Sequence, residues 1–424
     1  MNPRLELATY AVKDVVWGHG SAYRSGTLAV DRHDVDRLAA DESTFESITV
    51  HIVKPGERTR LVHLLDAVEP RWKASGPGGI FPGILGSTET VGEGRTHRLG
   101  GLALIQAARP PQEATGLLQP REAVMDMWGE GARYSPFGDC ILLALEVIPK
   151  ASAGNADFDA ALRRFTCRLA EWLAKLTAED EPTSVKVFQT GGADCLPKVG
   201  YFYQLSSVGI FSDTYLYGRP VEHMVPTLIH PNEVLDGALV GGNYLYAPYH
   251  IPTFLHQNNP VLLECYRRHG RELDFRSVVL ARGHNYTQMD KERCAHYAAN
   301  LFRLTGCDAV VLTGEGGGNS AIDMMLTCRY LEEHGIKTCV LSYELGGPSG
   351  ADFPLLDWVP QADAIVSAGI TDTFVQLEAP DRVIGGDSFV NIPGNPRQAQ
   401  RMTLHDLYLS TSQVGAGCLA AAAF

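Results

Sequence analysis

The chain has 424 residues, of which 45% are hydrophobic and 20% are charged, and its net charge at pH 7 is −13. This composition is ordinary for a globular protein with a substantial core, and the length allows two or three domains. The acidic balance argues against nucleic acid or an anionic membrane surface as the main partner. The sequence shows no run of about 18 apolar residues and no apolar signal core at its start, so we expect a cytoplasmic protein without a membrane span.

The first part of the chain predicts a mixture of strands and helices. Residues alternate as in strands at 27–30 and 47–53, and the segment between them, 31–40, has the acidic first turn typical of a helix. The run 76–83 is rich in glycine and proline, so we expect a loop there. A strand at 140–148 follows. A helix at 157–176 then places on one face the apolar residues Phe158, Leu162, Phe165, Leu169 and Leu173.

From about residue 275 the pattern changes to strands that alternate with helices. Strands are predicted at 276–280, 309–313, 337–341 and 364–366, with helices at 289–304 and from 319 to about 334. Units of this length imply a mostly parallel sheet with helices on both faces. We therefore predict an α/β fold in three parts: a mixed α+β N-terminal domain (1–225), a junction segment (226–274) and a doubly wound C-terminal domain (275–424).

A glycine-rich loop, Gly314-Glu-Gly-Gly-Gly-Asn319, follows the predicted strand 309–313 and opens the next helix. It departs from the dinucleotide fingerprint because Asn319 takes the place of the third glycine, and no Lys-Ser/Thr follows as in a P-loop. An anion site at the helix N-terminus and a tight turn for close packing are alternatives. We favour a loop that lines a substrate or subunit cleft, with Glu315 and Asn319 as its polar groups.

Two loops of the N-terminal half carry further candidates. Arg95 and His97 follow a Gly-Glu-Gly turn, where the guanidinium could clamp a carboxylate. A surface or interdomain salt bridge is the simpler interpretation of Arg95. The carboxylates of Asp126 and Glu130, close to the aromatic run 134–137, could hold an ammonium group by charge and cation–π contact, or form a partly covered loop.

The densest polar region of the chain spans residues 230–259. Polar residues among glycines and apolar residues are costly to bury without partners, so they indicate a site or a tightly hydrogen-bonded junction. His230, Glu233 and His256 are the residue types of a metal site, but Pro231 weakens the helical spacing and no other ligand is fixed. Asparagines in turns usually bond the backbone. The remaining candidates here are Asn232, Asp236, Asn258 and Asn259.

Several longer runs carry a resemblance to a known family. They are Arg4-Leu-Glu-Leu, 60–71, Gly79-Ile-Phe-Pro-Gly83, Gly92-Glu-Gly-Arg-Thr-His97, the segments 230–244 and 256–260, Arg268-His-Gly270, Glu315-Gly-Gly-Gly-Asn319, Gly335-Ile-Lys-Thr338 and Ile384-Gly-Gly386. On these runs the chain resembles, nearly end to end, the proprotein subunit of component B of the glycine, sarcosine and betaine reductases. The related D-proline reductase uses a similar subunit.

The resemblance implies a chemistry that this chain has altered. In that family the chain cleaves itself in front of a cysteine, which becomes a pyruvoyl group. At the matching position this chain has Tyr244, after Asn243. A phenol can neither make the acyl shift nor eliminate to leave a pyruvoyl electrophile. The resemblance therefore implies an unprocessed chain without pyruvoyl and with no other cofactor expected, and it makes Asn243 and Tyr244 candidates at the reaction centre.

The family's subunit works with a second subunit that bears selenocysteine, and together they remove the amino group from an amino-acid substrate reductively. Three interpretations follow. The chain is half of a hetero-oligomeric enzyme that cleaves a carbon–nitrogen bond next to a carboxylate, in amino acid or specialised metabolism, with a thiol, selenol or metal on the partner. Alternatively, it is a structural or regulatory subunit of that complex. The third alternative is a self-sufficient metal enzyme that uses His230, Glu233 and His256.

We predict that the peptide bond between Asn243 and Tyr244 stays intact in the purified protein. Denaturing mass spectrometry should therefore give one species of 46.1 kDa. Two fragments divided at this bond would contradict the prediction. The Tyr244→Cys variant, measured in the same way, tells whether the tyrosine alone blocks cleavage: fragments would show that it does, and an uncut variant would show that other processing residues are missing.

Overall fold

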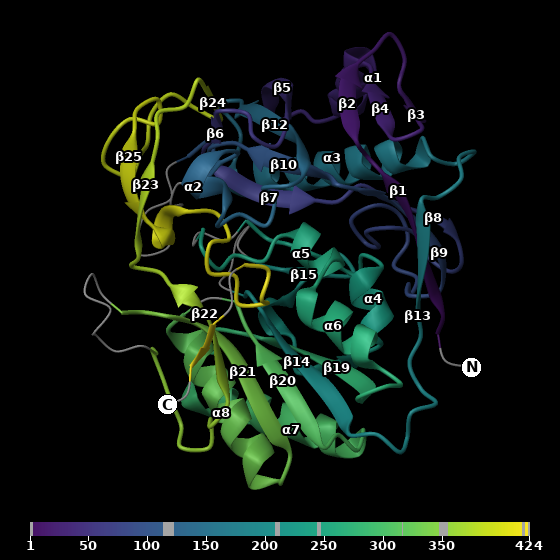
Figure 1. The fold of residues 1–424 in the computed structure, drawn as a ribbon, viewed down its shortest axis with the longest axis vertical. Helices are drawn as coiled ribbons and strands as arrows, with labels where there is room; N and C mark the ends of the chain where they lie inside the picture. Colours follow the sequence, from purple (N-terminus) through teal and green to yellow (C-terminus); the bar gives the residue numbers. More distant parts are fainter. Residues whose placement is uncertain are drawn as a thin grey trace.

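The computed structural model describes residues 3–112, 123–207, 213–243, 247–315, 317–346, 355–417 and 420–422. Figure 1 shows a seven-stranded sheet in the lower half of the molecule and several smaller sheets in the upper half, with short helices between the two. The chain therefore has a mixed α/β fold, as the sequence predicts.

Two four-stranded sheets make up most of the upper half. The long helix α3 (Asn155–Lys175) packs against both of them, and α1 (Arg32–Ala39) packs on α3. The predicted apolar face of α3 is buried as expected, so this helix joins the two sheets into one core. One sheet has the order β13 (Ser184–Phe188), β1 (Leu5–Ala11), β9 (Gly94–Gly100), β8 (Arg71–Ser75); the other has the order β5 (Phe45–Val53), β12 (Ile141–Pro149), β10 (Leu102–Ala107), β7 (Leu64–Val68).

Smaller elements complete the upper half, and one of them pairs a strand from the C-terminal part of the chain with a strand from its N-terminal part. The strand β24 (Arg382–Ile384) pairs in parallel with β6 (Thr59–Leu61), so the C-terminal part returns to the N-terminal strands. The other small elements are β2 (Asp14–Trp17), β3 (Ala22–Arg24), β4 (Thr27–Val30), β11 (Met125–Asp126), α2 (Gly129–Ala132), β15 (Tyr215–Leu216), β16 (Arg219–Pro220), the 3₁₀ turns η1 (Val221–His223) and η2 (Leu404–Asp406), β18 (Leu239–Val240), β23 (Phe374–Leu377) and β25 (Gln400–Thr403).

The seven-stranded sheet is parallel in its centre and antiparallel at both edges. A parallel sheet of this kind requires cover on both faces, and its central strands are accordingly apolar. Its order is β17 (Thr227–Ile229), β19 (Asp274–Arg282), β14 (Lys198–Leu205), β20 (Ala309–Thr313), β21 (Lys337–Glu344), β22 (Ile365–Ile370) and β26 (Ala420–Ala422).

Alternate residues of β14 face opposite layers of helices. Phe202 packs with the long helices α7 (Gln288–Leu304) and α8 (Asn319–Glu333). Tyr201 and Tyr203 face the other side, where they pack in the core that the sheet shares with the upper half. The short helices of that side are α4 (Pro231–Leu235), α5 (Thr253–Gln257) and α6 (Pro260–Arg268).

The predicted strands and helices all occur, and their bounds differ from the predictions by a few residues. The run 76–83 lies outside helices and strands, as expected. The large sheet takes β14 and β17 from the parts of the chain before residue 275, and β24 joins the upper half. The sheets thus combine residues from all three predicted parts, and the boundaries at 225 and 275 stay a prediction. Within the described ranges, the helices are all too short or too polar to cross a membrane.

Two residues of α7 offer a direct test of the core between the large sheet and its helices. Phe302 is fully buried and Leu304 is 74% exposed on the same helix. We expect Phe302→Ala to lower the free energy of unfolding by about 3–5 kcal/mol, because it removes buried area and leaves a cavity. Leu304→Ala should change it by less than about 0.5 kcal/mol. Equal effects of the two variants in urea denaturation would contradict this packing.

Candidate functional site

A buried carboxylate lies at the carboxyl ends of the central parallel strands. Glu315 comes two residues after β20, and its side chain is 1% exposed. Its oxygens accept hydrogen bonds from the backbone N–H of Ile251 at 3.0 Å and of Ser206 at 3.3 Å, and one of them lies 3.2 Å from His250 Nδ1. These contacts join β20, the end of β14 and the segment before α5. Ligand sites of open parallel sheets form at this end of the strands.

His250 is the functional candidate that the sequence analysis missed. Its side chain is 2% exposed, and its ring lies 6.0 Å from the ring of Tyr408. One ring nitrogen faces Glu315, and the other, Nε2, is buried without a hydrogen-bond partner among the residues that the structure describes. A single histidine has no spacing pattern in the sequence. The only available signal was its place six residues after Tyr244.

A second buried carboxylate, Asp66 of β7, approaches the same region from the upper half. It accepts hydrogen bonds from Thr253 N at 2.7 Å and from Thr253 Oγ1 at 2.6 Å. Thr253 Oγ1 in turn accepts from the N–H of Gly241 at 2.8 Å. Burial raises the pKa of Asp66 to about 6, and the two hydrogen bonds from Thr253 oppose this rise. Asp66 is therefore an acidic group that exchanges a proton close to neutral pH.

The backbone of residues 241–243 packs closely against the backbone at Asp213. A Cβ atom on Gly242 would lie 2.0 Å from the carbonyl oxygen of Asp213, so only glycine fits at this position. Asn243 is buried, and its Nδ2 donates to Asp159 Oδ1, while its Oδ1 has no hydrogen-bond partner within the described ranges. Asp159 pairs with the buried Arg163 on α3. Tyr244, the residue that follows, lies outside the described residues.

The predicted His256 and Asn259 lie beside this region, in contact with two tyrosines of β14. His256 Nδ1 is 2.7 Å from Tyr203 OH, and Asn259 Nδ2 donates to Tyr201 OH at 3.1 Å. The two tyrosine rings stack with their centroids 5.1 Å apart. Burial lowers the pKa of His256 to about 3, so its imidazole is neutral at pH 7. Its Nε2 is buried and has no partner among the described residues.

The other predicted residues of the junction serve to hold segments together. His230 caps the N-terminus of α4, and the carboxylate of Glu233 accepts a hydrogen bond from the backbone N–H of His230 at 2.8 Å. Asn232 donates to the carbonyl oxygens of Pro3, Gly92 and Phe188. Because His230 and Glu233 satisfy this cap while His256 binds Tyr203, the three side chains have separate tasks. The described part of the chain contains no group of three or more His, Cys, Asp or Glu placed to hold a metal ion.

Asp236 and Asn258 hold buried cations in the junction. Asp236 is fully buried, pairs with Lys73, and accepts from Gly92 N at 2.7 Å. Asn258 Oδ1 accepts from Arg71 Nη2 at 2.9 Å and from Arg98 Nη1 at 3.0 Å. Each of these contacts compensates a charge that would otherwise be costly to bury.

The candidates that the sequence placed in loops of the N-terminal half have other partners than Glu315. Arg95 is paired with Glu6 at 2.7 Å on the surface, where both line an open groove of about 540 Å³. His97 is buried between Tyr10 and Thr177. Asp126 makes a two-pronged salt bridge with the buried Arg60 at 2.7 and 2.8 Å.

Glu130 and Asn319 are exposed at the first turns of α2 and α8. Asn319 therefore does not share the buried surroundings of Glu315, four residues before it.

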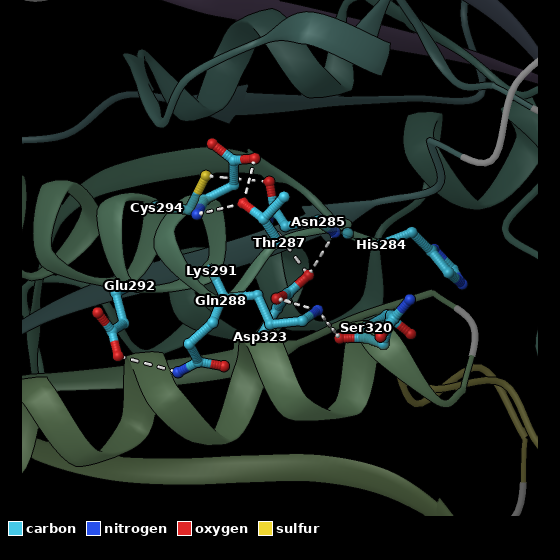
Figure 2. Close-up of polar contacts among 12 residues, drawn as sticks. His284, Asn285, Thr287, Gln288, Lys291, Glu292, Cys294, Ser320 and Asp323 are labelled. Atoms are coloured by element: carbon cyan, nitrogen blue, oxygen red, sulfur yellow. Dashed lines mark hydrogen bonds and ion pairs between the residues drawn. The ribbon is translucent and has the colours of Figure 1, made fainter.

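The loops at this edge of the sheet are fixed by an ion pair between α7 and α8, shown in Figure 2. Lys291 Nζ donates to Asp323 Oδ1 at 2.9 Å and to the carbonyl oxygen of Asn319 at 3.2 Å. Asp323 Oδ2 also accepts from the backbone N–H of Asn285 at 2.9 Å. Since both ions are nearly buried, this pair orients the loop after β19 and the start of α8.

Asp66 offers a test of these electrostatics through stability. A rise of its pKa from about 3.9 in the unfolded chain to about 6 in the fold corresponds to about 3 kcal/mol. This stabilisation is present below about pH 4 and is lost as pH rises through about 6, because the folded form binds the proton more tightly. From pH 4 to pH 7 the stability of Asp66→Asn should therefore improve relative to wild type by about 2 kcal/mol in urea denaturation, because part of the total is already lost at pH 4. Asp36→Asn, on the exposed face of α1, is the matched control, and the same pH dependence in both variants would contradict the assignment.

Known proteins are similar to this chain over most of its length. Residues 3–401 match the family described as glycine/sarcosine/betaine reductase component B subunits. The chain is 35% identical over 390 residues to the glycine reductase complex component B subunits alpha and beta of Acetoanaerobium sticklandii, which covers 90% of this chain and 89% of that protein. It is 34% identical over 389 residues to the sarcosine reductase complex component B subunit alpha of Peptoclostridium acidaminophilum, with the same coverage. The betaine reductase complex component B subunit alpha of that organism is 30% identical over 400 residues, 90% of this chain and 88% of that protein. No solved structure was found to match the chain.

Proposed function

This chain belongs to the family of glycine/sarcosine/betaine reductase component B subunits, and we propose that it acts as one subunit of a heteromeric reductase of that kind. In this proposal the complex breaks a carbon–nitrogen bond next to a carboxylate in an amino-acid-like substrate. A second subunit supplies the attacking thiolate, selenolate or metal. The cytoplasm is the proposed location.

The buried carboxylates around residues 241–243 are the observation that carries the proposal. Asp66 lies beside Gly241 and Asp159 bonds Asn243, while Glu315 bonds the following segment at Ile251; Arg163 is the buried cation that pairs with Asp159. Three buried carboxylates against one buried arginine are costly even when neutral donors hydrogen-bond them, and such an excess of negative charge is typical of a functional site. In this proposal the negative charge attracts a cationic substrate nitrogen, which binds at the carboxyl ends of the parallel strands.

The family's pyruvoyl group does not fit this chain. The position after Asn243 carries a phenol, which has no route to a pyruvoyl group, so no electrophilic carbonyl is available to bind a substrate amine. We propose instead that this chain binds and orients the substrate, excludes water from it and manages its protons. The attacking group then comes from the partner subunit.

One observation favours a second candidate function, in which the chain only holds and shapes its partner. Most of the polar residues predicted as site residues are used to tie segments together, as Asn232 and Asp236 show. Such a subunit would be needed for assembly, but its buried carboxylates would have no part in turnover.

Reconstitution with the partner subunit tests the proposal. The chain and a second, thiol- or selenol-bearing subunit from the same source should form a complex that releases amine from glycine, sarcosine or betaine when a dithiol is supplied, whereas neither subunit alone should do so. In the complex, Glu315→Gln should reduce turnover at least about 100-fold without preventing assembly.

Glu264→Gln is the matched control, because Glu264 is exposed and pairs only with neighbouring arginines of α6. Full activity of the Glu315→Gln complex would favour the purely structural subunit. Amine release by the isolated chain would contradict the proposal.

A further inference from the structure

Helix α7 and the turn before it carry the most exposed apolar side chains among the residues that the structure describes. Leu304, Met289 and Tyr286 have the largest exposed fractions of the large apolar residues, at 74%, 68% and 67%. Tyr297, in the middle of the helix, is 56% exposed. Single exposed apolar residues are ordinary, but several of them gathered on one element mark an interaction surface.

The exposed apolar side chains share one face of the helix. At 3.6 residues per turn, Met289, Tyr297 and Leu304 fall within about 80° of arc, and the exposed Arg293 and Asn300 lie between them. These five residues form what we call the α7 face. Figure 1 shows α7 on the side of the large sheet that is turned away from the upper half. The residues that the helix buries on its other side include Ala295, Ala298, Ala299 and Phe302.

One flank of the α7 face carries two opposite charges near the two ends of the helix. Glu292 and Arg303 point within about 20° of each other around the helix, but they are eleven residues and about 16 Å apart, too far to pair. Glu292 accepts a hydrogen bond from Gln288 of the same helix at 2.9 Å, as Figure 2 shows. Arg303 is exposed, and neither charge takes part in an ion pair within the described ranges.

Two such helices in an antiparallel arrangement bring these opposite charges together. A two-fold axis beside Tyr297 makes the same flank of each helix face that of the other. It places Glu292 of one copy opposite Arg303 of the second copy, twice, because the two residues lie five and six positions from Tyr297. It also places Met289 opposite Leu304 of the second copy. A parallel pair would instead set Glu292 beside Glu292 and Arg303 beside Arg303, which is unfavourable.

The polar residues in the middle of the α7 face fit the same arrangement. Arg293 forms an ion pair with Asp290 of its own helix, so its charge is already compensated. In the antiparallel pair it comes opposite Asn300 of the second copy, whose side-chain carbonyl can accept a hydrogen bond from a guanidinium. The face therefore places no uncompensated charge in the contact.

We propose that two copies of this chain associate through α7, antiparallel about a two-fold axis beside Tyr297. The contact is isologous, since each copy supplies both halves of it. It lies on the face of the large sheet opposite the short helices of the junction, so the candidate site stays outside it. The association does not depend on the proposed reaction.

The size of the contact sets the strength that we expect. A helix of 17 residues is about 25 Å long, so one helix pair lies at the small end of specific interfaces, and association should be in the micromolar range. Sedimentation velocity of the chain from about 1 to about 100 μM should show a growing species of twice the chain mass of 46.1 kDa. A chain that stays single at the highest concentration would overturn the proposal.

Charge reversal tests the antiparallel register. Arg303→Glu sets a negative charge opposite Glu292 in both halves of the contact, so it should weaken the association at least about tenfold. Glu292→Arg/Arg303→Glu exchanges the two charges and should restore the wild-type dissociation constant to within about threefold. The matched control is Asp36→Arg on the exposed face of α1, which should leave the association unchanged. A double variant as weak as Arg303→Glu would contradict the register and the contact with it.

Truncation tests the apolar part of the contact. Tyr297→Ala should weaken the association at least about 30-fold, because it removes both rings at the two-fold axis. Trp358→Ala is the control, since Trp358 is similarly exposed, at 54%, outside α7. Leu304→Ala should weaken the association about tenfold, while the unfolding of a chain too dilute to associate stays nearly unchanged. Association that survives Tyr297→Ala would show that another surface carries it.

The different subunit of the proposed complex is the competing occupant of the α7 face. Native mass spectrometry of the reconstituted complex should find two copies of this chain, and Tyr297→Ala should halve the complex while the different subunit stays bound. Loss of the different subunit from the variant would overturn the proposal, because α7 would then bind that subunit. If no complex forms at all, the proposed function fails, and sedimentation of the chain alone still decides whether two copies associate.

Discussion

The side chain of Glu315 joins the parts of this molecule that meet at its centre. A carboxylate that is nearly free of solvent must be compensated, and here the compensation comes from the end of β14, from the segment before α5 and from His250. The same contacts that satisfy the charge tie the segment before α5 to the large sheet, and Thr253 of α5 in turn bonds Asp66 of the upper half. The position of the candidate site is thus a consequence of where this one charge can be buried.

The polar residues of the junction fall into two groups. In one group all buried polar atoms of the side chain have hydrogen-bond partners, and in the other one buried atom lacks a partner. Asn232, Asp236 and Asn258 have donors and acceptors matched by distant segments, and such closed networks stabilise and orient the fold. Asn243 and His250 each keep one buried atom without a partner among the described residues. Open positions of this kind are costly in a fold and are characteristic of places where a ligand or a reacting group completes the bonding.

The sequence predicted local structure well and distant pairing poorly. Buried strands such as Ala309–Thr313 and the apolar face of α3 leave periodic patterns, so both are predictable. The pairing of Arg382 with Thr59 joins residues far apart in the chain and leaves no local signal. The glycine-rich loop after β20 identified Glu315 as a candidate, and the family resemblance identified Asn243. It could not find His250, because the role of a lone histidine depends on which carboxylate the fold places behind it.

The central claim is that the intact chain works as one half of a complex. Native mass spectrometry of the protein purified gently from its source, with metal analysis of the same sample, tests this claim most directly. We predict an uncut chain of 46.1 kDa in a stoichiometric complex with a second, different subunit. An uncomplexed chain that carries a stoichiometric metal ion would contradict the account and would turn attention to His230, Glu233 and His256.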